Sequence, residues 1–81
     1  MTNLHTVMLW QEAVREFEAY ILPSIRHTEK QNNGGKSWVD GPMRREAWNN
    51  FTDALCKEGK ISDWQYENWS QPASCEREPK W

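Results

Sequence analysis

Apolar residues recur at helical spacing in the first quarter of the chain. Successive members of the stripe are three or four residues apart, which is the period of one face of an α-helix. They are Val7, Trp10, Val14, Phe17 and Ile21. We therefore predict a first helix over about residues 4–22. It is expected to end before Pro23, because a proline disfavours the helical conformation of the residue that precedes it.

The stripe has two interpretations. Amphipathic helices of small domains usually bury their apolar side against their own chain, which makes the stripe part of the core. The same spacing also fits heptad positions, which would make it the seam of a homodimer, although only about two heptads are present. We adopt the core interpretation and keep a structural homodimer as an alternative.

A polar connection follows the first helix. Residues 24–27 are expected to continue as a kinked turn that brings Ile25 onto the core. The segment TEKQNNGGKSW then has Asn-Asn-Gly-Gly at its centre, which is typical of a mobile loop. We predict a long loop over residues 28–41, in which Trp38 and Val39 dock onto the helices as a lid.

A second helix is predicted over residues 42–58 from its caps and its apolar arc. Asp40, placed just before Gly-Pro, is the expected N-cap, and Gly59 is the residue able to take the left-handed conformation at the helix end. At 100° per residue, the apolar side chains fall within an arc of about 140°. These are Met43, Ala47, Trp48, Phe51, Ala54 and Leu55.

A third, short helix is predicted over residues 62–70. Ser62 and Gln65 have the spacing of a capping box, and Ile61 precedes them as a possible staple onto Tyr66. The remaining residues, 71–81, contain two prolines and four charges without periodicity. We expect them to form an extended or disordered tail.

The predicted architecture is a small all-α domain of three helices over residues 1–70, followed by a loose tail. Few aliphatic residues are available for its core, but six Trp, two Phe and two Tyr supply apolar area. The predicted core residues are Val7, Trp10, Val14, Phe17, Ile21, Met43, Ala47, Phe51, Leu55 and Ile61.

The tryptophans outnumber the places where a core of this size can hide them. Trp64 and Trp69 point about 140° apart around an ideal helix, so one short helix cannot bury both against the same neighbour. Arg44 falls within the apolar arc and is expected either to stack on Trp48 or to act as a recognition arginine. The candidate protein-binding surface consists of Trp38, Arg44, Arg45, Trp48, Trp64 and Trp69.

Charge argues against a nucleic-acid partner. Ten Lys and Arg face twelve Asp and Glu, which leaves a formal charge of −2. The second and third helices outline a helix-turn-helix, so a small DNA-binding regulator is an alternative function. However, the third helix carries Asp63 and Glu67 and no Lys or Arg, and these carboxylates would repel phosphate. The balance therefore favours a protein partner.

No pattern of reactive residues indicates chemistry. His5, His27, Cys56 and Cys75 lack the close spacing of zinc ligands, and no nucleophile elbow or phosphate-binding loop occurs. We expect no metal, no cofactor and no enzymatic activity. Cys56 is expected to be an exposed thiol. A Cys56–Cys75 disulfide would need the tail to fold back and an oxidising compartment.

The N-terminus lacks a basic region before its apolar residues, and no window is long enough to span a bilayer, so we expect a cytoplasmic protein without a membrane partner.

The pattern W-x2-F-x-D-x-L-x3-G-x-I-x3-Q-x3-W-x2-P, which runs from Trp48 to Pro72, resembles the C-terminal part of small accessory proteins encoded by bacteriophages and prophages. The resemblance covers about a third of the chain. It implies a compact, non-enzymatic protein in the host cytoplasm that binds and inhibits or diverts a host protein, as anti-CRISPR proteins do. It assigns no functional residue, because any helical hairpin would use this packing pattern.

Overall fold

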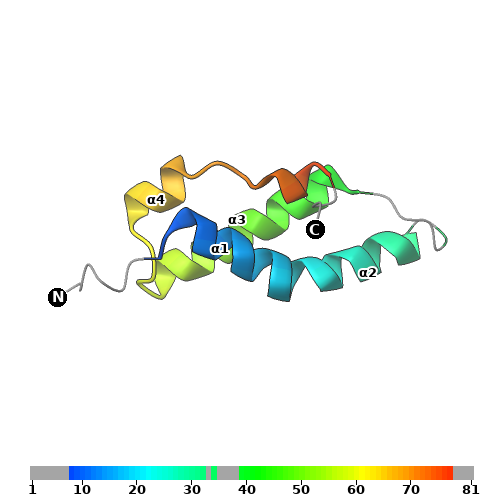
Figure 1. The fold of residues 1–81 in the computed structure, drawn as a ribbon, viewed down its shortest axis with the longest axis horizontal. Helices are drawn as coiled ribbons and strands as arrows, with labels where there is room; N and C mark the ends of the chain where they lie inside the picture. The colour runs from blue at the N-terminus through cyan, green and yellow to red at the C-terminus, as the bar shows by residue number, and fades with distance from the viewer. Residues whose placement is uncertain (1–7, 33, 35–38, 78–81) are drawn as a thin grey trace.

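The computed structural model describes residues 8–32, 34 and 39–77, and within these ranges the secondary structure consists of helices, with no strand. The elements are α1 (Trp10–Glu16), the π-helical turn η2 (Phe17–Ile21), α2 (Leu22–Asn32), α3 (Gly41–Lys57), α4 (Asp63–Asn68) and the 3-10 turn η3 (Ala73–Cys75). Because α1, η2 and α2 are continuous, the described chain forms three helices, and the predicted all-α fold is confirmed. Figure 1 shows the first of them beside α3, with α4 and η3 near opposite ends of α3.

The first helix begins later than predicted. Met8 and Leu9 are not helical, because the Met8 N–H donates to the carbonyl of Lys60 (2.9 Å) and Leu9 is extended. The helix starts at Trp10, where the Glu12 carboxylate accepts the Leu9 N–H (2.8 Å). Val7 and the other residues before Met8 lie outside the described residues.

Pro23 does not end this helix. A proline has no N–H, and in a regular α-helix its ring collides with the carbonyl four residues back. Here the turn η2 comes just before it, and the Leu22 N–H reaches five residues back to the carbonyl of Phe17. A π-helical turn of this kind shifts the backbone and accommodates the proline. The first helix therefore continues to Asn32 instead of ending at about residue 22.

The extension occupies part of the predicted loop 28–41. Ile25 and Glu29, one helical turn apart, are both buried on the side of α2 that faces α3. The apolar pattern did not predict this part of α2, because its second buried residue, Glu29, is a carboxylate rather than an apolar side chain. Trp38, the predicted lid, lies outside the described residues, and Val39 is half-buried.

The predicted caps of the other two helices are present. Asp40 Oδ1 accepts the Met43 N–H (3.0 Å) at the start of α3, and Gly59 takes a φ of 78° just beyond its end. At the start of α4, Ser62 Oγ accepts the Gln65 N–H (3.1 Å) and Gln65 Oε1 accepts the Ser62 N–H (2.6 Å). Local sequence thus determines where both helices begin.

The core lies between the first helix and α3. Its buried apolar residues are Ala13, Phe17, Leu22, Ile25, Trp48, Leu55, Ile61 and Cys75. Of the predicted core, Phe17, Leu55 and Ile61 are buried. The other described members are only half-buried at its edge: Trp10, Val14, Ile21, Met43, Ala47 and Phe51. The described residues of the stripe in the first helix therefore pack within their own chain.

Candidate functional site

A buried ion pair joins α2, α3 and the C-terminal segment. Arg44 Nε and Nη2 each donate to one carboxylate oxygen of Glu29 at 2.7 Å, and Nη1 donates to the carbonyl of Ser74 at 2.8 Å. Glu29 also accepts the backbone N–H of Asp40 (2.8 Å). Arg44 is fully buried and Glu29 is 3% exposed, so this group of contacts is part of the interior.

The pKa of Glu29 is lowered by this arrangement. Burial by itself would raise it, because the charged carboxylate loses its water. The hydrogen bonds from Arg44 and from the Asp40 backbone, together with the charges of Arg44 and Arg26, outweigh burial and hold the pKa below the ordinary 4.5. Glu29 is therefore ionised at neutral pH and matches the charge of Arg44.

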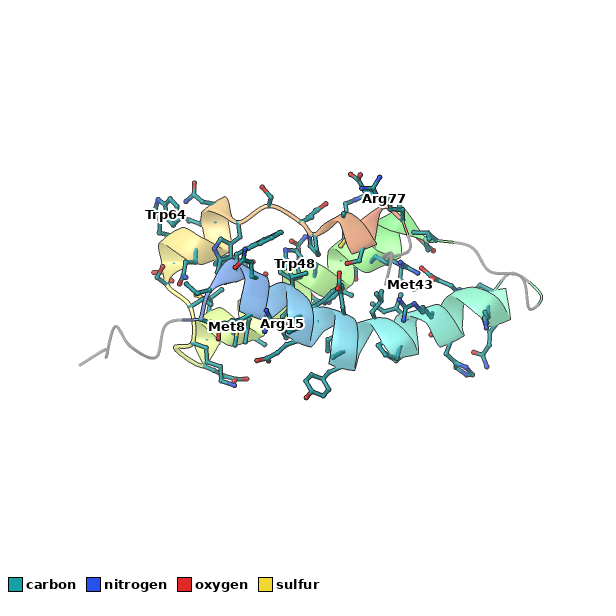
Figure 2. The ribbon with its side chains drawn as sticks, viewed as in Figure 1. Met8, Arg15, Met43, Trp48, Trp64 and Arg77 are labelled. Atoms are coloured by element: carbon teal, nitrogen blue, oxygen red, sulfur yellow. The ribbon has the colours of Figure 1, made fainter. Side chains whose placement is uncertain are left out.

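Arg44 and Trp48 were predicted to belong to a protein-binding surface, but the structure places both in the interior. Trp48 is 2% exposed and packs edge-to-face on Phe17, with ring centroids 5.3 Å apart. Figure 2 shows it between the first helix and α3. The inward arc of α3 includes both residues, and Glu29 supplies the charge that lets Arg44 enter it. Arg45 is half-buried.

The described part of the predicted tail, residues 71–77, is packed against α3 instead of being loose. Pro72, Ser74 and Cys75 are buried, and the Cys75 thiol lies 3.5 Å from the carbonyl of Arg44. Further back, the Trp10 indole N–H donates to the carbonyl of Ser70 (2.8 Å). The acceptors in these contacts are backbone carbonyls, which every residue has, so the composition of the C-terminal segment did not predict its packing.

The two cysteines are free and far apart. Cys75 lies beside Arg44, and Cys56 is twelve residues further along α3, which is about 18 Å at about 1.5 Å per residue. Disulfide geometry requires the two Cα atoms to lie within about 7 Å, so this fold does not allow the Cys56–Cys75 bond. Burial raises the pKa of Cys75 to about 11. Cys56 is half-buried, not fully exposed as predicted.

Exposed aromatic rings are found on α4. Trp64 is 67% exposed and Tyr66 is 40% exposed, whereas Trp69 is half-buried against the core. The two tryptophans therefore separate as their angular spacing requires, and it is Trp64 that faces outward. Figure 2 shows the Trp64 side chain at the outer end of α4, pointing away from the other helices.

The helix that carries Trp64 is fixed to the rest of the fold. Gln65 Nε2 donates to the carbonyl of Met8 (2.9 Å), in addition to its place in the capping box. Ile61, just before the helix, is 4% exposed, and Trp69 packs on the core just after it. Contacts at both ends of α4 thus define the position of the exposed Trp64 indole.

Carboxylates surround this aromatic pair. Asp63 Oδ1 accepts the thiol proton of Cys56 (3.2 Å), and the pKa of Cys56 is raised first by this bond and then by burial and the charges of Asp63, Asp53 and Glu67. A DNA backbone would meet Asp63 and Glu67 on this helix and no cation, because the chain has no Lys or Arg from Ile61 to Glu76.

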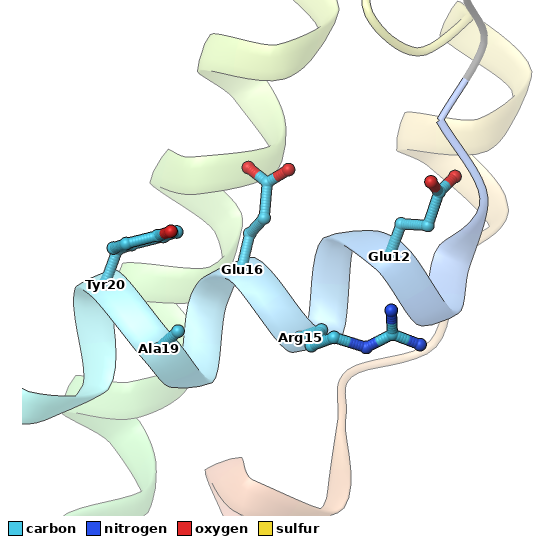
Figure 3. A pocket seen from close by; sticks show the side chains of 5 residues that line it. All are labelled: Glu12, Arg15, Glu16, Ala19 and Tyr20. Atoms are coloured by element: carbon cyan, nitrogen blue, oxygen red, sulfur yellow. The ribbon is translucent and has the colours of Figure 1, made fainter.

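A shallow depression of about 310 Å³ lies on the first helix. Its lining residues are Glu12, Arg15, Glu16, Ala19 and Tyr20. Figure 3 shows that the carboxylates of Glu12 and Glu16 point to the same side of this single helix, with the Tyr20 ring beyond them. A surface formed by one helix encloses no ligand, so we assign it no function.

Sequence reasoning missed Glu29 as the partner of Arg44. The available signal was its spacing, since Ile25 and Glu29 follow Ile21, the last residue of the preceding stripe, at intervals of four residues. Trp64 and Trp69 both belonged to the predicted protein-binding surface, and only the packing of Trp69 on the core showed that Trp64 is the exposed one.

Among the described residues, no group of three or more His, Cys, Asp and Glu gathers closely enough to hold a metal ion. In the same part of the chain, no helix has the length and apolar character needed to cross a membrane. Comparisons with protein-family models, with curated proteins and with solved structures found no match to this chain.

Proposed function

We propose that this protein is a non-enzymatic binding module that acts by covering a surface of another protein with the outward side of α4. The observation that supports the proposal is Trp64, an indole 67% exposed on a helix that is otherwise firmly attached. Tryptophan and tyrosine are enriched among the residues that dominate binding free energy at protein interfaces. Trp64 and Tyr66 are the aromatic residues of α4 in such a position.

The attachment of α4 supports binding as much as the exposure does. A side chain that is already held in place loses little conformational freedom when a partner binds. The capping box of Ser62 and Gln65, the Gln65 bond to Met8 and the buried Ile61 hold the helix before any partner arrives. Trp64 therefore presents a preorganised contact.

We also propose that the partner is a protein of the host cell. The pattern from Trp48 to Pro72 resembles accessory proteins of bacteriophages and prophages, which supports a host protein as the target, inhibition as the result and the host cytoplasm as the place. In the fold, the pattern's Trp48, Leu55, Ile61 and Pro72 are buried. Its residues therefore account for packing, and the origin in a mobile element rests on the resemblance.

The test uses a matched pair of exposed aromatic residues. Trp64 and Tyr20, which is 77% exposed on the first helix, are each replaced by alanine. Partners captured from a bacterial lysate by the wild-type chain are purified, and their affinities for the three proteins are measured by calorimetry. We expect Trp64→Ala to weaken binding by about 30-fold, the loss that corresponds to about 2 kcal/mol for a dominant interface residue. Tyr20→Ala should bind like the wild type.

Equal affinity of Trp64→Ala and wild type for every captured partner would contradict the proposal. Circular dichroism of each variant provides the folding control, because an exposed side chain should leave the helical content unchanged.

A further inference from the structure

The outward side of α4 places two carboxylates between two aromatic rings. At about 100° per residue, the order around the helix is Tyr66, Asp63, Glu67 and Trp64, over an arc of about 160°. All four residues are exposed. We call this set the α4 face. An acidic centre with an aromatic ring on either side differs from a plain apolar patch in the kind of partner it accepts.

Two lysines closely precede α4 in the sequence, and both have carboxylate partners outside the α4 face. Lys57 pairs with Asp53 (2.9 Å) and Lys60 pairs with Glu58 (3.3 Å), so each lysine that precedes α4 has a carboxylate of its own on or just after α3. From Ile61 to Glu76 the chain contains no Lys or Arg. Asp63 and Glu67 thus give this end of the molecule a negative potential.

We propose that the partner contacts the α4 face with a cationic segment, one of whose arginine or lysine side chains lies over the Trp64 indole while its charge meets Asp63 and Glu67. This inference rests on the proposed function and specifies the chemistry of its partner. A cation over a tryptophan face is the strongest of the cation-π pairs, and a guanidinium also matches a carboxylate with two parallel hydrogen bonds.

Other classes of occupant fit less well. An apolar protein surface would remove water from Asp63 and Glu67 without returning a charge, which carries a large desolvation cost. A nucleic acid or an anionic lipid surface would bring phosphate against the same carboxylates. A basic protein segment can place a cation over the Trp64 ring and pair with the carboxylates of Asp63 and Glu67.

The probe for this inference is a synthetic peptide with four arginines in a glycine-serine background. The matched control peptide has citrulline at the same positions, because citrulline keeps the shape of arginine and lacks its charge. Each peptide is titrated into the 15N-labelled full chain, and amide and indole N–H resonances are followed by NMR. We expect the arginine peptide to shift the Trp64 indole and the amides of α4, and the citrulline peptide to shift them at least severalfold less.

Variants locate the interaction. Trp64→Ala and Glu67→Gln should each weaken the arginine peptide at least threefold, whereas Tyr20→Ala and Glu46→Gln, which replace exposed residues elsewhere, should leave it unchanged. Raising the salt concentration from about 0.05 to about 0.5 M should also weaken it, because salt screens exposed charges. Equal binding of the citrulline peptide, no binding of the arginine peptide, or insensitivity to Trp64→Ala would each overturn the inference.

These outcomes are separable from the test of the proposed function. A captured partner that depends on Trp64 but binds independently of salt and of Glu67 would keep the binding module and reject its cationic partner. If no captured partner depends on Trp64, the binding module itself is rejected.

Discussion

Glu29 and Arg44 illustrate how a single pair of residues defines the relation between distant parts of this chain. Each is charged and buried, and removing an ion from water costs several kcal/mol even inside a relaxed protein. Hydrogen bonds offset this cost. Both carboxylate oxygens of Glu29 accept bonds from Arg44, and the third guanidinium nitrogen of Arg44 donates to the carbonyl of Ser74. The pair thus specifies how α2, α3 and the C-terminal segment meet.

Breaking the pair should be far more damaging than replacing it. We expect Arg44→Met alone to lower the free energy of unfolding by about 3–5 kcal/mol, because it leaves the Glu29 carboxylate buried without its partner. The double variant Arg44→Met, Glu29→Leu should recover most of this loss. Urea unfolding of the wild type, both single variants and the double variant measures the coupling, and additive losses would disprove it.

The same carboxylate predicts a dependence of stability on pH. Because the folded state lowers the pKa of Glu29, its ionised form stabilises the fold fully above the ordinary value of 4.5. That contribution is lost as the pH falls below 4.5 and through the lower folded-state pKa. Between pH 6 and pH 3, the free energy of unfolding should therefore decline less in Glu29→Gln than in the wild type. Parallel declines would rule out this role.

At the scale of elements, the sequence predicts helix ends that depend on nearby residues and misses features that depend on distant ones. The caps Asp40 and Ser62 bond to N–H groups three residues away, so sequence spacing alone identified them. Pro23 was read as a stop because the rule for prolines assumes a regular α-helix, and the π-helical turn η2 removes that assumption. The bonds that hold residues 69–77 come from Trp10 and Arg44, which are distant in sequence.

The packed C-terminal segment can be tested through its thiol. Cys75 is fully buried, and burial raises its pKa to about 11, so a disulfide reagent should modify it in the folded protein at least about tenfold more slowly than in the unfolded chain. The Cys56→Ser variant isolates this reaction, and measurements with and without urea supply the comparison. Equal rates in the two conditions would mean that the segment is not packed.

At the scale of the whole molecule, the stripe of the first helix is already used within one chain. Phe17 is fully buried against Trp48, and the neighbouring stripe residues Val14 and Ile21 pack at the edge of the same core. A dimer seam on this stripe could use only its half-buried edge, because Phe17 is enclosed within the chain. The described surface carries exposed aromatic rings near carboxylates on α4, at one end of the molecule, and at Tyr20 on the first helix.

A monomer is the expected state in solution. Light scattering coupled to size-exclusion chromatography should give the mass of one chain even at high protein concentration, because Phe17 of the apolar stripe is buried within its own chain and Val14 and Ile21 pack at the edge of the same core. A concentration-dependent rise toward twice that mass, retained in Trp64→Ala, would point to a dimer formed elsewhere than at α4.

The sequence by itself determined the helical class, the caps of α3 and α4 and the glycine stop. It also determined that Trp64 and Trp69 could not both be buried against the same neighbour. Each of these features depends on residues within one or two helical turns. Only the tertiary structure decided that Arg44 and Trp48 belong to the interior, that the first helix continues through Pro23, and that the segment after Trp69 is packed. The reason is physical. A buried charge is tolerated only when its partner arrives from a distant segment, and here that partner is Glu29, from a stretch whose polar composition indicated a loop.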